Sequence, residues 1–309
     1  MKKGRSEHLP YLIPSATAPC FGQQLRARLA EGGLLRIPGA HNGLAALQAK
    51  AAGFQALYVS GGAISASMGL PDLGILTVDD VAFFTRMIVR AAGLPVLVDV
   101  DTGFGEILNV MHTVRVMEDA GAAAIQIEDQ LLPKKCGHLN DKKLADPRDA
   151  AAKIAAAVRA RRDLLVVART DAFAKEGLDS AVARARIYIE AGADALFPEA
   201  LTSLEELAAF ARALPDVPLL ANMTEFGVTP ECTASELEAM GYRMVIWPVS
   251  SLRVAARAQQ RLYGKLAIEG TTRSLLPEML TRAELYELID LSSYEELGGC
   301  CTIVSLGGV

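Results

Sequence analysis

Short, continuously apolar runs alternate with longer Ala-rich segments of helical period along most of the chain. Continuous apolar character is typical of strands that are covered on both faces, and strands that alternate with helices predict a parallel sheet. The eight expected strands are Leu34–Pro38, Ala56–Ser60, Val96–Asp101, Ala124–Glu128, Leu165–Arg169, Ala195–Glu199, Leu219–Asn222 and Met244–Pro248. The eight expected helices lie near residues 41–52, 78–92, 108–120, 147–161, 179–191, 203–213, 233–240 and 251–267.

Residues at the helix ends support this alternation. Asp179 and Ser203 precede their helices, where N-cap residues belong. Glycines follow five of the helical runs, as C′ glycines do, at positions 53, 93, 121, 192 and 241. Eight such units in about 230 residues predict an α/β protein with a (β/α)8 TIM barrel. An open doubly wound sheet is the alternative, but a dinucleotide-binding fold has little support because no Gly-x-Gly-x-x-Gly follows a strand.

The chain is expected to divide into three parts. These are an N-terminal extension at residues 1–22, a barrel catalytic domain at residues 23–268, and a C-terminal helical segment and tail at residues 269–309. A helix near residues 276–297 has no barrel strand to follow. We therefore expect the C-terminal segment to pack on a neighbouring subunit and to be swapped between subunits.

Composition narrows the classes of partner. The net charge is −5, the pI is about 5.5, and no basic block occurs beyond the first three residues, which argues against a nucleic-acid partner. No apolar run approaches the ~20 residues of a membrane span, and the N-terminus lacks the apolar core of a secretory signal. The five cysteines are an odd number without CxxC spacing, so a reduced, cytoplasmic location is expected.

Polar residues gather at the ends of the expected strands. In a barrel these ends converge on one mouth, where active sites lie. Helix capping explains two or three of them, but not all six groups. The groups are Ser60-Gly61-Gly62, Asp99-Val-Asp101, Glu128-Asp129, Arg169-Thr170-Asp171, Glu199 and Asn222-Met-Thr224.

Two of these carboxylates favour a metal. Asp99 and Asp101 are two apart on a strand, so both side chains point the same way. Mg²⁺ takes one or two protein carboxylates and completes its shell with water and substrate oxygens. Glu128 could join through a water, and nitrogen and sulfur ligands in zinc-like spacing are absent. The alternative is a repelling pair relieved by an arginine.

Residues 134–138 read Lys-Lys-Cys-Gly-His. Positive neighbours favour the reactive thiolate, so Cys136 is a candidate for proton transfer or nucleophilic attack, although a structural thiol beside solvated lysines is an equal alternative. Arg169 and Arg253 are candidate bidentate carboxylate clamps. The Ser60-Gly61-Gly62 turn offers a hydroxyl and open backbone N–H groups to a carboxylate, and Tyr58 shares its side of the strand.

The motifs together resemble the isocitrate lyase/phosphoenolpyruvate mutase superfamily, most closely its methylisocitrate lyase branch, over roughly residues 24–296. The Cys-Gly-His sequence is typical of the lyase branch. Residues 139–143, Leu-Asn-Asp-Lys-Lys, depart from the Arg-Pro-rich continuation of that branch. The matching stretches are Ser-Gly-Gly at 60–62, Val-Asp-Val-Asp-Thr-Gly-Phe-Gly at 98–105, Ile-Glu-Asp-Gln at 127–130, Lys-Lys-Cys-Gly-His at 134–138, Ala-Arg-Thr-Asp at 168–171, Phe-Pro-Glu-Ala at 197–200 and Asn-Met-Thr-Glu-Phe-Gly at 222–227.

The resemblance implies a role for each matching position. Cys136 is the expected catalytic acid, with Tyr58 as candidate base and His138 as a further catalytic candidate. Phe197 and Ile246 fall where this branch shapes an apolar pocket for a methyl group. The expected Mg²⁺ ligands are Asp99 and Asp101, with Asp72 and Glu128 nearby. The expected substrate-binding residues are Ser60, Gly61, Gly62, Cys136, Gly137, Arg169, Glu199, Asn222, Thr224, Arg253 and Arg282.

The resemblance also implies a reaction and an assembly. The expected reaction is Mg²⁺-dependent cleavage of a 2-hydroxy tricarboxylate into pyruvate and succinate, in a homotetramer that acts in propionate catabolism. A 2,3-dimethylmalate lyase is the nearest alternative activity. An oxaloacetate decarboxylase is more distant because Cys136 argues against it. A metabolite-binding barrel without activity is the alternative outside the enzymes.

Overall fold

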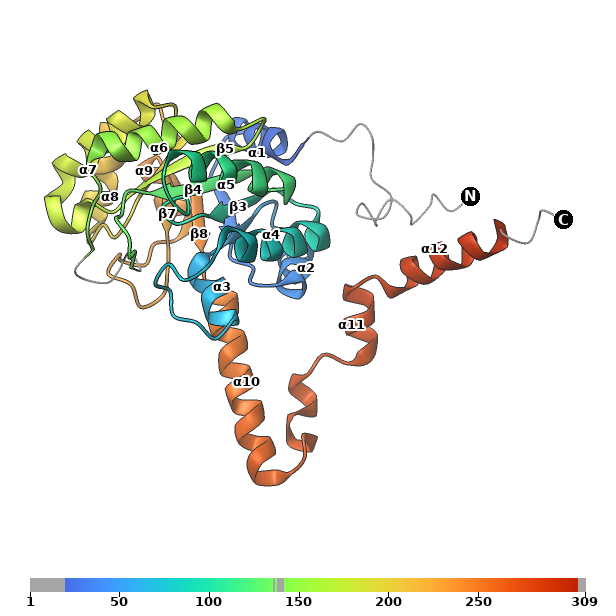
Figure 1. Ribbon diagram of the computed structural model, residues 1–309. Helices are drawn as coiled ribbons and strands as arrows, with labels where there is room; N and C mark the ends of the chain where they lie inside the picture. The colour runs from blue at the N-terminus through green and yellow to red at the C-terminus, as the bar shows by residue number, and fades with distance from the viewer. Residues whose placement is uncertain (1–19, 136, 138–141, 305–309) are drawn as a thin grey trace.

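The computed structural model describes residues 20–135, 137 and 142–304, with side chains up to residue 299 (Figure 1). Expectations for Cys136, for His138 and for residues 1–19 therefore lie outside the described residues. The division into an extension, a barrel domain and a C-terminal segment stays a prediction.

All eight expected strands are present, with ends at most two residues from the expected positions. Each pairs in parallel with its neighbours, in the orders β1-β8-β7 and β2-β3-β4-β5-β6, and single bridges join Gly39 to Tyr58 and Leu196 to Leu219. The α/β fold with parallel strands is confirmed. The strands are β1 (Leu35–Pro38), β2 (Leu57–Val59), β3 (Val96–Asp99), β4 (Ala124–Glu128), β5 (Leu165–Thr170), β6 (Ala195–Pro198), β7 (Leu220–Asn222) and β8 (Met244–Trp247).

Helices surround the strands, and most follow the expected positions (Figure 1). α1 and α3 were not expected, and α7 begins six residues before its expected start, with a break at Gly177 where φ is 80°. The helices around the strands are α1 (Phe21–Ala30), α2 (Gly43–Ala51), α3 (Gly61–Ser67), α4 (Val78–Ala92), α5 (Ile107–Asp119), α6 (Pro147–Ala160), α7 (Phe173–Glu190), α8 (Leu204–Ala213) and α9 (Ala234–Met240).

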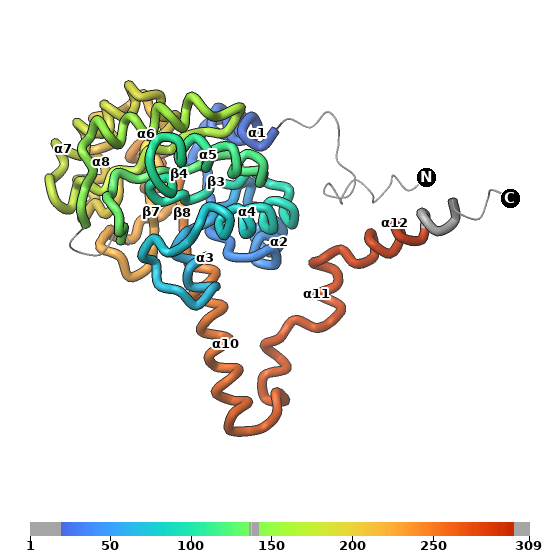
Figure 2. Tube along the Cα trace, viewed as in Figure 1, coloured from blue at the N-terminus to red at the C-terminus, as the bar shows by residue number. Residues whose placement is uncertain are grey.

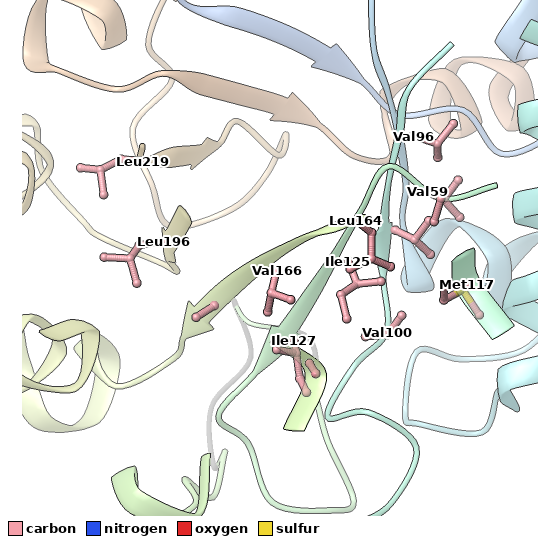
Figure 3. Close-up of a cluster of buried hydrophobic side chains, with 14 of the residues drawn as sticks. Val59, Val96, Val100, Met117, Ile125, Ile127, Leu164, Val166, Leu196 and Leu219 are labelled. Carbon is pink, nitrogen blue, oxygen red and sulfur yellow. The ribbon is translucent and has the colours of Figure 1, made fainter. Parts of the chain in front are cut away.

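Two layers of apolar side chains hold the strands. Successive strand residues point to opposite faces, so Val98 packs outward against the helices while its neighbour Leu97 packs inward among the strands. Figure 3 shows the outer layer, which includes Ile125 and Val166. Apart from Gln126 in β4 and Arg36 in β1, both faces of the strands are largely apolar, so most polar side chains gather at the strand ends, where the site forms.

The C-terminal region extends away from the strands, as the tube in Figure 2 shows. α10 (Ser250–Glu269) has no buried residue, and Ile268 is 86 % exposed. The single helix expected near residues 276–297 is instead a 3-10 turn, η2 (Arg273–Glu278), followed by α11 (Arg282–Leu288) and α12 (Leu291–Val304). α11 approaches α2, while α12 points away from the strands (Figures 1 and 2). Among the described residues, no helix is both long and apolar enough to cross a membrane.

Candidate active site

A cavity of about 350 Å³ opens at the carboxyl ends of the strands. It collects the strand-end residues on which the sequence prediction depended, together with apolar side chains from β6, β8 and the start of α10. Its lining is Tyr58, Ser60, Gly62, Ala66, Asp72, Asp99, Glu128, Lys134, Lys135, Gly137, Arg169, Phe197, Glu199, Asn222, Thr224, Ile246, Pro248, Val249, Leu252 and Arg253.

Three other expected site residues are among the described residues but do not line the cavity. Gly61 lies directly behind the wall, where its N–H donates to Asp99 Oδ2 at 3.2 Å. Asp101 is also adjacent, because its N–H donates to Asp99 Oδ1 at 3.1 Å. Arg282 lies on the exposed surface of α11 within this chain, so its assignment stays a prediction.

An ammonium group lies between the expected metal-binding carboxylates. Lys134 is 3 % exposed, and its Nζ is 2.5 Å from Asp72 Oδ1 and 2.6 Å from Asp101 Oδ1. Burial and the nearby Asp99 raise the pKa of the Asp101 carboxyl to about 7, although Lys134 opposes the shift. Asp101 also has a φ of 49°, a conformation that few side chains other than Asn and Asp adopt readily. The backbone is therefore bent so that this carboxylate faces its neighbours.

The residues present fit a hard divalent cation. Asp72, Asp99 and Glu128 line the cavity, and Glu128 Oε1 is buried with no hydrogen-bond partner among the described residues. No group of three or more metal-ligating side chains forms within the described part of the chain. Mg²⁺ commonly uses only one or two carboxylates and keeps several waters, so this sparse set suits it.

Arg169 is a second buried cationic group in the lining of the cavity. It is 8 % exposed, its Nη1 lies 3.3 Å from Glu128 Oε2, and its Nε lies 3.6 Å from Glu199 Oε2. The guanidinium also stacks over the Phe197 ring at 5.2 Å. Asn222 Nδ2 lies 3.3 Å from both carboxylate oxygens of Glu199. The guanidinium is thus held by several contacts while it faces the cavity, as a preorganised carboxylate-binding group requires.

Asp171 fixes Arg169 from behind. Its Oδ2 accepts a hydrogen bond from Arg169 Nε at 2.9 Å, and its Oδ1 accepts one from Nη2 at 3.0 Å. Burial would raise the pKa of Asp171, but Arg169 and Lys142 outweigh burial and lower it to about 2. The carboxylate is therefore ionised at neutral pH, which suits its role between two cations.

Gly137 reaches the cavity wall because it has no side chain. A Cβ there would lie 2.4 Å from Arg169 Nη2 and 2.5 Å from Glu199 Cγ, closer than atoms can approach. The flanking position 135 also lines the cavity. The backbone at Gly137 therefore lies directly against the Arg169 guanidinium.

Tyr58 is buried and donates a hydrogen bond from its hydroxyl to Gln126 Oε1 at 2.7 Å. Burial and the nearby carboxylate of Asp99 raise the pKa of the phenol well above 10. The phenol is therefore protonated at neutral pH, and in this state it acts as a donor rather than as a base. The assignment of Tyr58 as candidate base stays a prediction.

Sequence reasoning missed four residues that shape the site. It treated Lys134 only as a positive neighbour of the thiol, and it assigned no role to Gln126, Lys142 or Asp171. The sequence does not indicate that Lys134 is buried, since most lysines are solvated. The order Arg169-Thr170-Asp171 could have predicted the contact between Arg169 and Asp171, because residues two apart on a strand share a face.

Comparison with known proteins places this site in a family. A family model described as phosphoenolpyruvate phosphomutase matches residues 25–267, and the 2-methylisocitrate lyase of Bacillus subtilis is 56 % identical over 264 residues. The chain belongs to the phosphoenolpyruvate mutase/isocitrate lyase family. The Bacillus alignment covers 85 % of this chain and 87 % of the relative. The 2-methylisocitrate lyase of Escherichia coli is 47 % identical over 279 residues, which are 89 % of this chain and 94 % of the relative.

Solved structures of the phosphoenolpyruvate mutase/isocitrate lyase family share the fold. A 2,3-dimethylmalate lyase superimposes with a TM-score of 0.87 at 36 % identity, covering 94 % of this chain and 99 % of the neighbour. A phosphonopyruvate hydrolase in complex with oxalate and Mg²⁺ gives a TM-score of 0.83 at 33 % identity, covering 91 % of this chain and 99 % of the neighbour. The family thus includes enzymes of different chemistry on one scaffold.

Proposed function

We propose that this protein is a Mg²⁺-dependent carbon–carbon lyase that cleaves 2-methylisocitrate into pyruvate and succinate, within propionate catabolism. The observation that carries the proposal is the cavity at the strand ends. It brings the carboxylates of Asp99 and Glu128 together with the guanidinium of Arg169, and Phe197 and Ile246 add apolar side chains to the same lining. The identity to 2-methylisocitrate lyases over most of the chain supports this choice of substrate.

The metal is assigned to the carboxylate side of the cavity. Asp99, Asp101, Asp72 and Glu128 would hold Mg²⁺ directly or through water. When bound, the ion supplies Lewis-acid polarisation of the oxygen that becomes the carbonyl of pyruvate.

The remaining wall binds and orients the substrate. Arg169 pairs with a carboxylate of the tricarboxylate, and the Ser60 hydroxyl and the N–H of Gly62 donate to the keto-acid portion. The substrate's methyl group lies against Phe197 and Ile246, each 1 % exposed. The apolar wall has no hydrogen bonds to lose when it is covered. Burial of a methyl group there therefore contributes roughly 0.8 kcal/mol of binding free energy for each buried carbon.

Proton transfer completes the cleavage. A base removes the proton of the substrate hydroxyl, the C–C bond breaks, and its electron pair passes to the succinate portion as a stabilised carbanion. Cys136 then donates a proton to that carbon. Lys135 and Gly137, on either side of this cysteine in the sequence, both line the cavity, which supports the assignment.

The Cys136→Ser variant tests the acid. Loss of a general acid costs about 10²–10⁴-fold in rate, so we expect kcat to fall by at least 10²-fold while substrate binding changes little. Cys232→Ser is the control, since that thiol is buried away from the cavity. Wild-type turnover in Cys136→Ser would remove the cysteine from the mechanism.

The architecture is part of the same proposal. The bridges between β1 and β2 and between β6 and β7 support a closed eight-stranded barrel. The absence of any buried residue on α10 supports burial of the C-terminal segment against another subunit, in a homotetramer with exchanged helices. In that assembly Arg282 would reach the site of a neighbouring subunit. A cytoplasmic location suits such a metabolic enzyme.

A substrate panel tests the function directly. The purified protein with Mg²⁺ is incubated with 2-methylisocitrate, isocitrate, 2,3-dimethylmalate and oxaloacetate, and pyruvate, glyoxylate, propionate and oxalate are measured. Pyruvate and succinate from 2-methylisocitrate are the expected products. Faster cleavage of 2,3-dimethylmalate would favour the second activity, which the shared fold with that lyase makes the main alternative. No product from any acid would favour a binding protein.

A further inference from the structure

A buried lysine connects the segment after β4 to the substrate-binding wall. Lys142 is 3 % exposed, and its ammonium lies 2.8 Å from Asp171 Oδ1. The same ammonium donates a hydrogen bond to the carbonyl oxygen of Gly137. An ammonium buried to this extent requires a paired charge and hydrogen-bond acceptors. Lys142 therefore links the backbone at Gly137 to a carboxylate at the end of β5.

That carboxylate is shared with Arg169. Asp171 Oδ1 accepts from both Lys142 Nζ and Arg169 Nη2, while Oδ2 accepts from Arg169 Nε. One fully buried carboxylate thus sets the position of the guanidinium and, through the ammonium, the position of the Gly137 carbonyl. A displacement of Asp171 would move both groups together.

A second contact fixes the chain on the other side of Cys136. Gln130, 3 % exposed, donates from Nε2 to the carbonyl oxygen of Lys135 at 2.9 Å. The N–H of Lys135 donates back to Gln130 Oε1 at 3.0 Å. The backbone of Lys135 is therefore held through both of its polar groups by a side chain two residues after the end of β4.

We propose that Lys142, Asp171 and Gln130 are positioning residues for the cleavage reaction, because they fix the backbone on both sides of Cys136 relative to Arg169. The inference rests on the proposed function. None of the three needs to touch the reacting atoms. The alternative is a purely structural role, in which a buried ion pair contributes to folding and leaves the turnover of the folded enzyme unchanged.

Kinetics of Lys142→Met separate the two roles. The variant removes the ammonium and keeps an unbranched side chain. A displacement of ~1 Å can cost ~10²-fold in rate, so we expect kcat to fall about 10- to 100-fold, with a smaller change in KM. Asp171→Asn should raise KM as well, since Arg169 also loses its partner. Lys143→Met is the matched control, because Lys143 is the next residue and is exposed.

Hydrogen exchange supplies a readout that needs no substrate. In folded Lys142→Met, the amides of residues 131–145 should exchange faster than in the wild type, while the amides of β5 and β6 should exchange at the wild-type rate. In Lys143→Met, all of these amides should exchange at the wild-type rate. If the wild type fails to cleave 2-methylisocitrate but the exchange difference is present, the proposed function is wrong and the positioning contact stands.

Two results overturn the inference. One is a folded Lys142→Met variant with wild-type kcat on the acid that the wild type cleaves, and the other is unchanged exchange in residues 131–145. If Lys142→Met does not fold, Gln130→Leu undergoes both measurements. It is expected to show the same fall in kcat and the same faster exchange, and wild-type values in either overturn the proposal.

Discussion

Replacement of Gly137 by alanine probes the close approach of the backbone to Arg169 and Glu199. The new Cβ would lie 2.4 Å from Arg169 Nη2 and 2.5 Å from Glu199 Cγ. Non-bonded heavy atoms are most favourable at about 3.5–4.0 Å, so the backbone or both side chains must move by roughly 1 Å. Asp171 holds Arg169 through two hydrogen bonds, so the backbone at residue 137 takes up much of that shift.

The expected loss follows from this displacement. A misplacement of ~1 Å near a reacting centre costs ~10²-fold in rate. We therefore expect kcat/KM for the cleaved acid to fall about 100-fold, which corresponds to ~2.7 kcal/mol of transition-state stabilisation. The assay follows pyruvate formation in the presence of Mg²⁺, alongside a thermal unfolding curve for each variant.

Gly264→Ala is the matched control. No atom of the same chain lies within 4 Å of a Cβ at position 264, which is exposed on α10 within one chain and does not line the cavity. Alanine in a helix interior is more stable than glycine by roughly 0.5–1 kcal/mol, so this variant should keep its activity and unfold at an equal or higher temperature. A Gly137→Ala variant with wild-type kcat/KM would show that the wall has room for a methyl group, and the argument from close approach would be refuted.

Three further predictions follow from the site. Removal of divalent cations with EDTA should abolish product formation and Mg²⁺ should restore it; activity that survives chelation contradicts the metal assignment. Phe197→Ala should lower the free energy of unfolding by about 3 kcal/mol, the low end for such a change, because the buried ring also borders the cavity; a urea titration measures this, and a loss below about 1 kcal/mol contradicts the burial described. Arg169 and Lys142 overcome burial to lower the pKa of Asp171 to about 2. A lowered pKa stabilises the folded state above the unfolded pKa, and this contribution, on the order of 2 kcal/mol, is lost as pH falls from about 4 through about 2. Asp171→Asn should therefore show a weaker loss of stability over that acid range, measured by urea unfolding at a series of pH values, and an unchanged acid profile contradicts the assignment.

The strands could be predicted because they are short, mainly apolar runs that alternate with longer helical segments. α3 could not, because it begins with Gly61 and Gly62, which are poor helix formers. Ser60 caps this helix by accepting from the N–H of Ala63. Capping and burial between the strand end and α4 thus overcome the local propensity. α7 began earlier than expected because the break at Gly177 separates two helical pieces that follow one another.

The sequence predicted which residues line the site better than it predicted the contacts between them. Strand-end position alone identified Asp99, Glu128, Arg169 and Glu199, since parallel strands bring their carboxyl ends to one mouth. The ion pair between Lys142 and Asp171 joins residues 29 positions apart, and no periodicity encodes such a pair. The raised pKa of Tyr58 likewise depends on burial and on Asp99, which only the folded chain brings together.

Asp171 pairs with both Lys142 and Arg169, and this restricts the order in which the three residues can be replaced during evolution. Replacement of Lys142 alone leaves Asp171 neutralised by Arg169, and replacement of Arg169 alone leaves it neutralised by Lys142. Replacement of Asp171 alone leaves two buried cations without the carboxylate that lies between them, which is far more costly than either other step. A lineage that loses the carboxylate is therefore expected to lose one of the cations first, so the aspartate is not the first of the three residues to become free to vary.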